Sequence, residues 1–510
     1  MPAEAGQREQ DSPNGSRGDA TKDLDLELLE RVGKKPRGLK WRTSSWYITT
    51  VVAMGVATDC LSYSIVVPVL PYRLEQLKYT NISALTSWLL FAYSIGIFLF
   101  SFPIAYFFDR YPWRREPLVV AIIVLEGALI LFMLVTPFWL MVVSRFLMGA
   151  ASTVVWSVGF ALICENVEEK NIGRQIGFAL AGVSVGTTIA PPIGGALYSK
   201  LGWHAPFIFT IALCAIDLVA RLLVIEQKDL LKWEAKAKEV TQHEDHRPPT
   251  GVYQTVVSHG ALDPQSDGLK AADAVRTQPL DQTASPGRTI TQTPRKKLSP
   301  WSVLSALVRS PRGMSGFLMT FVYGIVLGSL DPTLTLRVQS VWGKNSEFVG
   351  LIYLASSAPT FVTGPIVGAL ADNFGAEWII APSLIMALPW LPLLILRNSL
   401  PGFVVFFALS QIFMSCALGP VGLEVAMAAR SIEGMSEIHQ FAAMNVAFSI
   451  STSIGAVVGG QMYGNVSSGW TAVVLFGFAC SAISVPVPFF FTGRKPLSSR
   501  LQDGRIALDL

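Results

Sequence analysis

Charged side chains occur inside long apolar stretches of this sequence, and they are the residues whose chemistry could serve a function. Asp59 lies in one such stretch with Tyr63 one helical turn further on, and Arg145 lies in another. An ionised side chain at mid-bilayer costs about 2.5–3.5 kcal/mol, so such residues face the interior of a helix bundle and are functional candidates. A carboxylate there can exchange a proton or bind a cation, whereas arginine stays protonated and can only bias a neighbouring carboxylate. Four further candidates for proton coupling or substrate binding are Glu126, Asp331, Glu424 and Asn445.

Each charged candidate also has a structural interpretation. Asp59 could be a hydrogen-bonded residue that supports the bundle, and Arg145 a static partner of backbone carbonyls. Asp331 precedes Pro332 and could mark a helix end, whereas Glu424 lies deep enough in its stretch to be central. Glu126 could be central or could face a neighbouring helix.

Two spacings indicate pairs or stripes. Asp217 and Arg221 are four residues apart, which favours a structural ion pair on one helix. Asn445, Ser449 and Ser453 recur every four residues and form one polar stripe, which either lines a cavity or joins helices through hydrogen bonds.

The composition places these residues in a membrane. Of 510 residues, 51% are hydrophobic and 15% are charged, against about 25% charged in soluble domains. Apolar runs of about 20 residues recur, and each can cross a bilayer as a helix. The net charge of +4 comes without a basic stripe, so we expect no nucleic-acid partner. No cysteine spacing typical of a metal site and no nucleotide-binding glycine loop occurs, so we expect no metal, no cofactor and no enzyme activity.

The apolar runs predict an all-α integral membrane fold with twelve transmembrane helices in two six-helix, pseudo-symmetric halves. The halves are residues 46–225 and 314–492. Residues 226–313 form a long polar insert that we expect to be mostly disordered, with a short interfacial helix at about 300–309. Residues 1–45 and 493–510 are predicted to be a disordered N-terminal region and a tail. Lys and Arg concentrate before span 1, after span 2 and in the tail, which predicts that both termini are cytosolic.

Short motifs recur at corresponding places in the two halves. Span 2 runs into Asp109, and span 8 runs into Asp372. Span 5 carries a glycine- and proline-rich motif, and span 11 carries a glycine pair. Such duplication is typical of transporters whose halves rock around a site at mid-membrane. Two glycosylation sequons, at Asn81 and Asn465, fall on the predicted outer side, where an unused tripeptide is the alternative.

These motifs resemble those of the major facilitator superfamily. The signature after span 2 matches at four positions, with Ala105 and Pro112 in place of its two glycines. The copy after span 8 has Asn373 in place of the basic residue. The resemblance implies gating or conformational roles for Asp109, Arg110, Arg114, Arg115, Asp372, Gly182, Gly186, Pro191, Gly194 and Gly195.

The span 5 motif and the span 1 sequence are similar to those of the twelve-span drug:proton antiporter branch. Asp59, nine residues before Pro68, resembles the vesicular amine transporters and fungal multidrug or secondary-metabolite exporters. One departure is Asn445, where those transporters carry an acidic residue. The resemblance implies a monomeric, proton-coupled antiporter that exports amphipathic, sometimes cationic, small organic molecules such as drugs or secondary metabolites.

Alternative interpretations remain open at this stage. A proton symporter or uniporter for a nutrient would share the fold, and an integral-membrane enzyme or receptor belongs to another class. We expect the plasma membrane, with a vacuole or vesicle as the alternative. The expected partners are a small-molecule substrate, protons and membrane lipid.

Overall fold

The computed structural model describes residues 38–111, 114–167, 171–226, 309–430 and 437–493, together with Ser305. Within these ranges the secondary structure is helical and no strand occurs. The predicted all-α membrane fold is thereby confirmed. Most of the predicted N-terminal region and tail, most of the 226–313 insert and most of the predicted interfacial helix lie outside the described residues. Within the region 1–45, which was expected to be disordered, Leu39–Arg42 forms a short helix.

The helices follow one another along the chain in two series. The first series is α2 (Leu39–Arg42), α3 (Ser45–Ser64), α4 (Leu70–Gln76), α5 (Ile82–Arg110), α6 (Arg115–Leu134), α7 (Phe138–Asn166), α8 (Ile172–Leu201) and α9 (His204–Leu223). The second series is α12 (Pro311–Trp342), α13 (Ser346–Ser357), α14 (Thr360–Phe374), α15 (Glu377–Ala387), α16 (Trp390–Leu393), α17 (Leu400–Arg430), α18 (Glu437–Asn465), α19 (Gly469–Ser484) and α20 (Pro486–Phe491).

Nine helical segments of the described residues are long and apolar enough to cross a membrane. The other three predicted spans correspond to the pairs α3/α4, α13/α14 and α15/α16, each interrupted by a turn. Every one of these turns contains a proline, namely Pro68, Pro359 or Pro389. Proline lacks an N–H and its ring clashes with the preceding helical turn, so it divides a span that hydropathy alone presents as continuous.

Small residues bring helices of one half into close contact. A Cβ atom on Gly182 of α8 would overlap the Ala53 carbonyl oxygen of α3. A Cβ atom on Gly455 of α18 would overlap the Ile325 carbonyl oxygen of α12 in the same way, and both relations recur four residues further on. The two halves therefore use the same small-residue packing between their first and fifth spans, as expected for close helix pairs in membranes.

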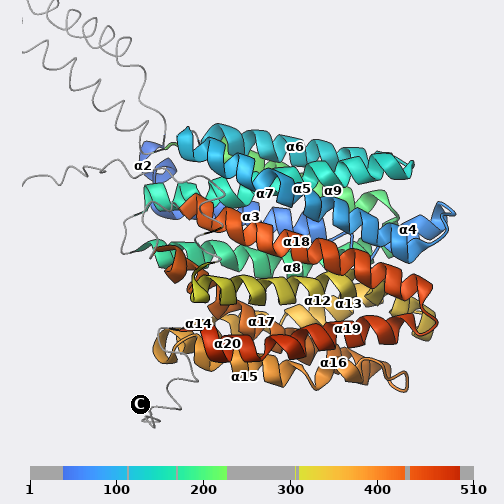
Figure 1. Ribbon diagram of the computed structural model, residues 1–510. Coiled ribbons are helices and arrows are strands. Elements are labelled where there is room, and N and C mark those ends of the chain that lie inside the picture. Colours follow the sequence, from blue (N-terminus) through green and yellow to red (C-terminus); the bar gives the residue numbers. More distant parts are fainter. Residues whose placement is uncertain are drawn as a thin grey trace, which may run out of the picture. The chain divides into compact units, whose positions relative to one another are not determined.

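The helices run side by side between two ends, which we call the Arg114 end and the Tyr72 end. In Figure 1 the Arg114 end is on the left, beside α2 and α14, and the Tyr72 end is on the right, beside α4. The two halves are joined by hydrogen bonds at the Tyr72 end. The Tyr72 hydroxyl donates to the Lys344 carbonyl at 2.7 Å, and the Ser83 hydroxyl donates to the Gly460 carbonyl at 2.7 Å.

Two more contacts join the halves at the Tyr72 end. The Gln339 amide donates to the Glu75 carboxylate at 2.9 Å, and the Ser346 hydroxyl donates to the Gly195 carbonyl at 3.1 Å. A Cβ atom on Gly195 would overlap the Ser346 carbonyl oxygen, so only glycine permits this approach. Gly195 thus packs between the halves, whereas Gly182 packs within one half.

Candidate functional site

Asp59 lies near the middle of the bundle and is 1% exposed. Its Oδ2 accepts hydrogen bonds from Ser152 Oγ at 2.7 Å and from Trp156 Nε1 at 2.9 Å, both on α7. Its Oδ1 accepts a longer bond from the Tyr93 hydroxyl at 3.5 Å. Ser152 and Trp156 are one turn apart, so one face of α7 presents both donors to the carboxylate. The donor roles of Trp156 and Tyr93 depend on which helices face Asp59, which the sequence alone does not specify.

Asp331 is the corresponding carboxylate of the second half. It lies within α12, which continues through Pro332 to Trp342, so Asp331 does not mark a helix end. It is 6% exposed and accepts from the Tyr353 hydroxyl of α13 at 3.2 Å and from the Tyr63 hydroxyl of α3 at 3.3 Å. The bond from Tyr63 crosses from the first half to the second. Sequence reasoning missed Tyr353, because nothing distinguishes it from the other aromatic residues of the spans.

A pair of aromatic rings connects the two carboxylates. The ring centroids of Tyr63 and Tyr93 are 4.9 Å apart. One hydroxyl of this pair donates to Asp331 and the other donates to Asp59. Within the described ranges no cation forms a salt bridge with either carboxylate, so neutral donors hold both. Such a carboxylate can lose its charge without leaving a cation unpaired.

Arg145 lies beside this pair and is fully buried. Its guanidinium carbon lies 4.7 Å from the centroid of the Phe132 ring, and its charge reaches the phenols of Tyr63 and Tyr93. None of its three guanidinium nitrogens has a hydrogen-bond partner among the described residues. The interpretation of Arg145 as a static partner of backbone carbonyls is therefore wrong for this conformation. A cation–π contact stabilises the charge without neutralising it.

Oε1 of Glu126 on α6 is buried and has no hydrogen-bond partner among the described residues. Its charge interacts with that of Asp217 on α9. Asp217 forms the expected ion pair with Arg221, with 2.9 Å between Oδ2 and Nε, and both side chains are almost completely buried. Thr58, next to Asp59, donates to Asp217 at 3.5 Å. This network supports the first half behind Asp59.

Glu424 was expected at the centre, and the structure places it at the Arg114 end instead. Its two oxygens accept from Arg312 Nε and Nη2, each at 2.9 Å, and Oε2 also accepts from the Gly493 amide at 3.3 Å. The physical reason is that Glu424 lies near the end of α17, which ends at Arg430. Arg312, in the first turn of α12, offers it a bidentate partner there. Sequence reasoning missed this partner because the two residues are 112 positions apart.

Asn445 does not connect helices through its amide nitrogen. Its Nδ2 is buried and has no hydrogen-bond partner in the described part of the chain, and the same holds for Ser453 Oγ. Ser449 donates within its own helix, to Val446. Thr452, next to the stripe, forms a hydrogen bond between the halves, because its hydroxyl donates to Ser94 Oγ of α5 at 3.1 Å. The cavity-lining interpretation of the stripe stays a prediction.

The loop after span 2 forms its ion pair and hydrogen bonds with residues of the first half. Arg114 is 4% exposed and pairs with Glu165 near the end of α7 at 2.6 Å. The Glu226 carboxylate accepts from the backbone amides of Arg114 and Arg115 at 3.2 and 2.8 Å. Arg110 donates to the Tyr106 hydroxyl at 3.2 Å. The side chains of Asp109 and Asp372 lie outside the described part, so their predicted gating role stays a prediction.

The remaining candidates lie at helix contacts or at the surface. A Cβ atom on Gly194 would overlap the Ile65 carbonyl oxygen, and the Pro191 carbonyl faces Gly350 of α13. Asn81 and Asn465 are exposed at helix ends, and their glycosylation stays a prediction. In the described ranges, no three His, Cys, Asp or Glu side chains form a group that could hold a metal ion.

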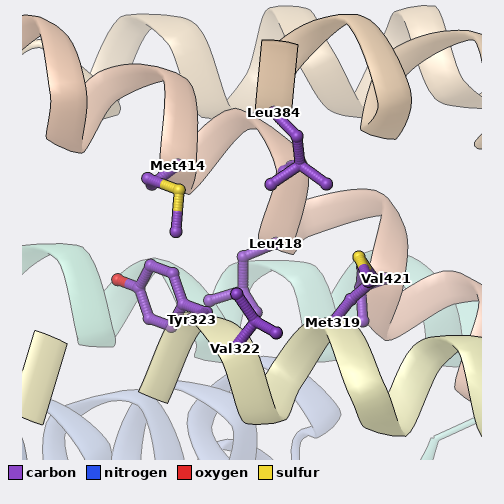
Figure 2. Close-up of a pocket in the computed structure, with 8 residues that line it drawn as sticks. Met319, Val322, Tyr323, Leu384, Met414, Leu418 and Val421 are labelled. Atoms are coloured by element: carbon purple, nitrogen blue, oxygen red, sulfur yellow. The ribbon is translucent and has the colours of Figure 1, made fainter. Parts of the chain in front are cut away.

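Two cavities lie away from the central carboxylates. Figure 2 shows the first, between α12, α15 and α17, where Met319, Tyr323 and Met414 lie among aliphatic side chains. Its volume is about 10 Å³, which is room for a single water at most. The second, of about 370 Å³, is an open apolar groove between α5 and α7. Neither is lined by any of the predicted coupling residues.

A model of the Major Facilitator Superfamily matches residues 52–312 and 316–507. The chain is 28% identical over 487 residues to an MFS-type transporter, ppzB, of Metarhizium rileyi, covering 90% of this chain and 97% of that protein. It is 26% identical to the multidrug resistance protein Stp of Mycobacterium tuberculosis, and the match covers 78% of this chain and 72% of that protein. It is 30% identical over 186 residues to a probable vesicular acetylcholine transporter-B of Danio rerio, and the match covers 35% of this chain and 38% of that protein.

Solved structures share the fold. A D-xylose–proton symporter superposes with a TM-score of 0.62 at 11% identity, covering 88% of this chain and 98% of that one. An inward-facing, unoccupied bacterial homologue of the human lysosomal transporter Spinster superposes with a TM-score of 0.58 at 15% identity, covering 90% and 98%. At these identities the likeness concerns the fold alone.

Proposed function

The chain belongs to the Major Facilitator Superfamily, and from that premise we propose that it is a proton-coupled antiporter. The proposed substrates are amphipathic small organic molecules, cationic ones among them. As a multi-pass membrane transporter it would have both termini in the cytosol and export substrate across the plasma membrane, with a vacuole or vesicle as the alternative site.

One observation carries the proposal. Each half contributes one buried carboxylate, Asp59 or Asp331, that is held by hydroxyl and indole donors only. A proton and an organic cation can compete for such a group, because either one neutralises it. Competition for one carboxylate is sufficient for exchange, since the arrival of the proton displaces the cation.

The aromatic surroundings of Asp59 suit the proposed substrates. Trp156 and Tyr93 donate to the carboxylate through ring edges, and the faces of such rings attract organic cations. The names of two similar proteins support the same class, since one is called a multidrug resistance protein and another a vesicular acetylcholine transporter.

The bond from Tyr63 to Asp331 connects this chemistry to motion. It joins α3 to α12, so it must break when the halves separate on that side. A charged Asp331 accepts this bond more strongly than a neutral one. Protonation from the outer side would therefore weaken the link and favour rocking of the halves.

The test is uptake into proteoliposomes that contain the purified full chain. Vesicles with an acidic lumen are given radiolabelled acetylcholine or ethidium, both fixed cations, so trapping of a protonated weak base cannot imitate transport. Each pH unit supplies about 1.4 kcal/mol per proton, which is about tenfold accumulation. Accumulation in the acidic lumen is expected for an antiporter. Accumulation only when the outside is acidic would favour the symporter, and no gradient dependence would refute proton coupling.

A further inference from the structure

The second half lacks the basic residue that the loop after span 2 carries in the first half. Asn373 stands at that position, and it is exposed at the Arg114 end. The sequence therefore leaves the second half without an arginine in that loop. The structure contains an arginine nearby that comes from a different element, Arg312 in the first turn of α12.

Arg312 forms a two-point contact with a buried acid. Glu424 on α17 is 4% exposed, and both of its oxygens lie 2.9 Å from guanidinium nitrogens of Arg312. The Gly493 amide, just beyond α20, donates to the same carboxylate. Glu377, the first residue of α15, adds a second negative charge whose field reaches Arg312. The Arg312–Glu424 pair thus lies where α12, α15, α17 and α20 of the second half come together.

The first half has the same arrangement with different connections. Arg114, in the loop after α5, pairs with Glu165 near the end of α7. Glu226, just after α9, accepts from the backbone of the same loop. Glu165 and Glu424 lie on corresponding helices, the fourth span of each half. All of these bonds lie within one half, and none of them joins one half to the other.

We propose that the Arg312–Glu424 pair is the internal clamp of the second half, in which Arg312 supplies the positioning charge that the loop after span 8 lacks. The inference rests on the proposed alternating-access transport. Rocking transmits a change at the centre to the ends only if each half moves as a rigid body. A clamp of this kind stays closed in both states of the transporter, unlike a latch between halves.

Transport and distances together test the clamp. Arg312→Ala and Glu424→Gln should each lose most of the gradient-driven ethidium uptake, and the exchanged pair Arg312→Glu with Glu424→Arg should recover a large part of it. Arg309→Ala is the matched control, because Arg309 is an exposed arginine three residues away. It should transport like the unmodified chain.

Spin labels distinguish a clamp from a latch. With the native cysteines replaced, labels at Arg309 and Asn373 report distances within the second half. Labels at Gly177 of α8 and Gly364 of α14, both in open surroundings, report distances between halves. The distribution of the Arg309–Asn373 distance should be narrow, with the same mean at acidic and neutral pH and with and without ethidium. The distribution should broaden in Arg312→Ala.

Three results would overturn the clamp. The first is an Arg309–Asn373 distance that changes with pH or with ethidium in the unmodified chain, which would make the Arg312–Glu424 pair a latch. The second is an Arg312→Ala protein with unchanged uptake and unchanged distance width. The third is a Gly177–Gly364 distance that stays fixed while the pH and ethidium change, which contradicts the rocking motion of the proposed function itself and removes the clamp with it.

Discussion

Replacing Asp59 by Asn should remove proton coupling and leave the fold intact. The carboxylate accepts from Ser152 and Trp156 on one oxygen and from Tyr93 on the other. An Asn amide can place its oxygen toward the first two donors and its NH₂ toward Tyr93, whose hydroxyl can turn to accept. The bonds change from charge-assisted to neutral, which costs about 1 kcal/mol each, and the removal of a buried charge offsets part of this.

The expected effect on transport is much larger than the effect on stability. If Asp59 carries the exchanged proton, a gradient of one pH unit holds about a tenfold substrate gradient per proton. Without a titrating group at position 59, a proton no longer displaces the substrate there, so the substrate equilibrates and the ratio of internal to external substrate falls to one. An amide is uncharged and does not bind or release a proton near neutral pH, so no residual pH dependence should arise from this position.

The assay compares three proteins in the same vesicles. Ethidium accumulation under an imposed pH gradient is measured for the unmodified chain, for Asp59→Asn and for Glu116→Gln. Glu116 is an exposed acid in the first turn of α6 and should have no effect. Thermal unfolding in detergent confirms equal folding. Unchanged accumulation by a well-folded Asp59→Asn protein would refute the assignment of the coupling proton to this residue.

Other variants test the packing and the links around the site. Gly186→Ala should lower the free energy of unfolding by about 1–3 kcal/mol, because the added Cβ meets the backbone of α3; Gly177→Ala, which meets nothing within 4 Å, should not, and thermal unfolding compares the two. Arg145→Met should keep or raise the unfolding temperature while lowering gradient-driven uptake, since it removes a buried charge that lacks a hydrogen-bonded partner among the described residues; a strongly destabilised protein would contradict this. Tyr63→Phe should speed hydrogen exchange at the helix ends that join the halves, whereas Tyr353→Phe, which removes a bond within one half, should not; equal rates would show that the bond across halves does not hold them together.

Much of the fold was predictable because lipid imposes simple rules on sequence. Spans of about 20 apolar residues must be helices, since every backbone group in lipid needs an internal partner. Gly182 and Gly186 pack against the backbone of α3, because the absence of a side chain permits close approach. The interruption of α13 and α14 was not predicted, since hydropathy ignores that Pro359 cannot continue a helix.

The candidate site was predictable by residue type and not by partner. Asp59 and Asp331 were identified because a carboxylate in an apolar span is costly wherever it points. Their donors depend on how helices distant in sequence face each other, which one sequence does not specify. Glu424 shows the limit most clearly. Its depth within a predicted span suggested the centre, whereas it lies near the end of α17 and is bound there by Arg312.

The strength of the contacts at the Tyr72 end explains how a proton could control opening. Five hydrogen-bonded contacts of the described residues join the halves there, and at about 0.5–1.5 kcal/mol net each they amount to about 2.5–7.5 kcal/mol. The exposed ion pair between Lys200 and Glu347 adds little to this sum. The Tyr63–Asp331 bond adds about 1.5–3 kcal/mol while the carboxylate is charged, and about 1 kcal/mol once it is neutral. Protonation of Asp331 would therefore reduce the cost of opening by about 0.5–2 kcal/mol. That reduction shifts the ratio of open to closed molecules by about 2-fold to 30-fold, and a gradient of about one pH unit supplies a free energy within this range.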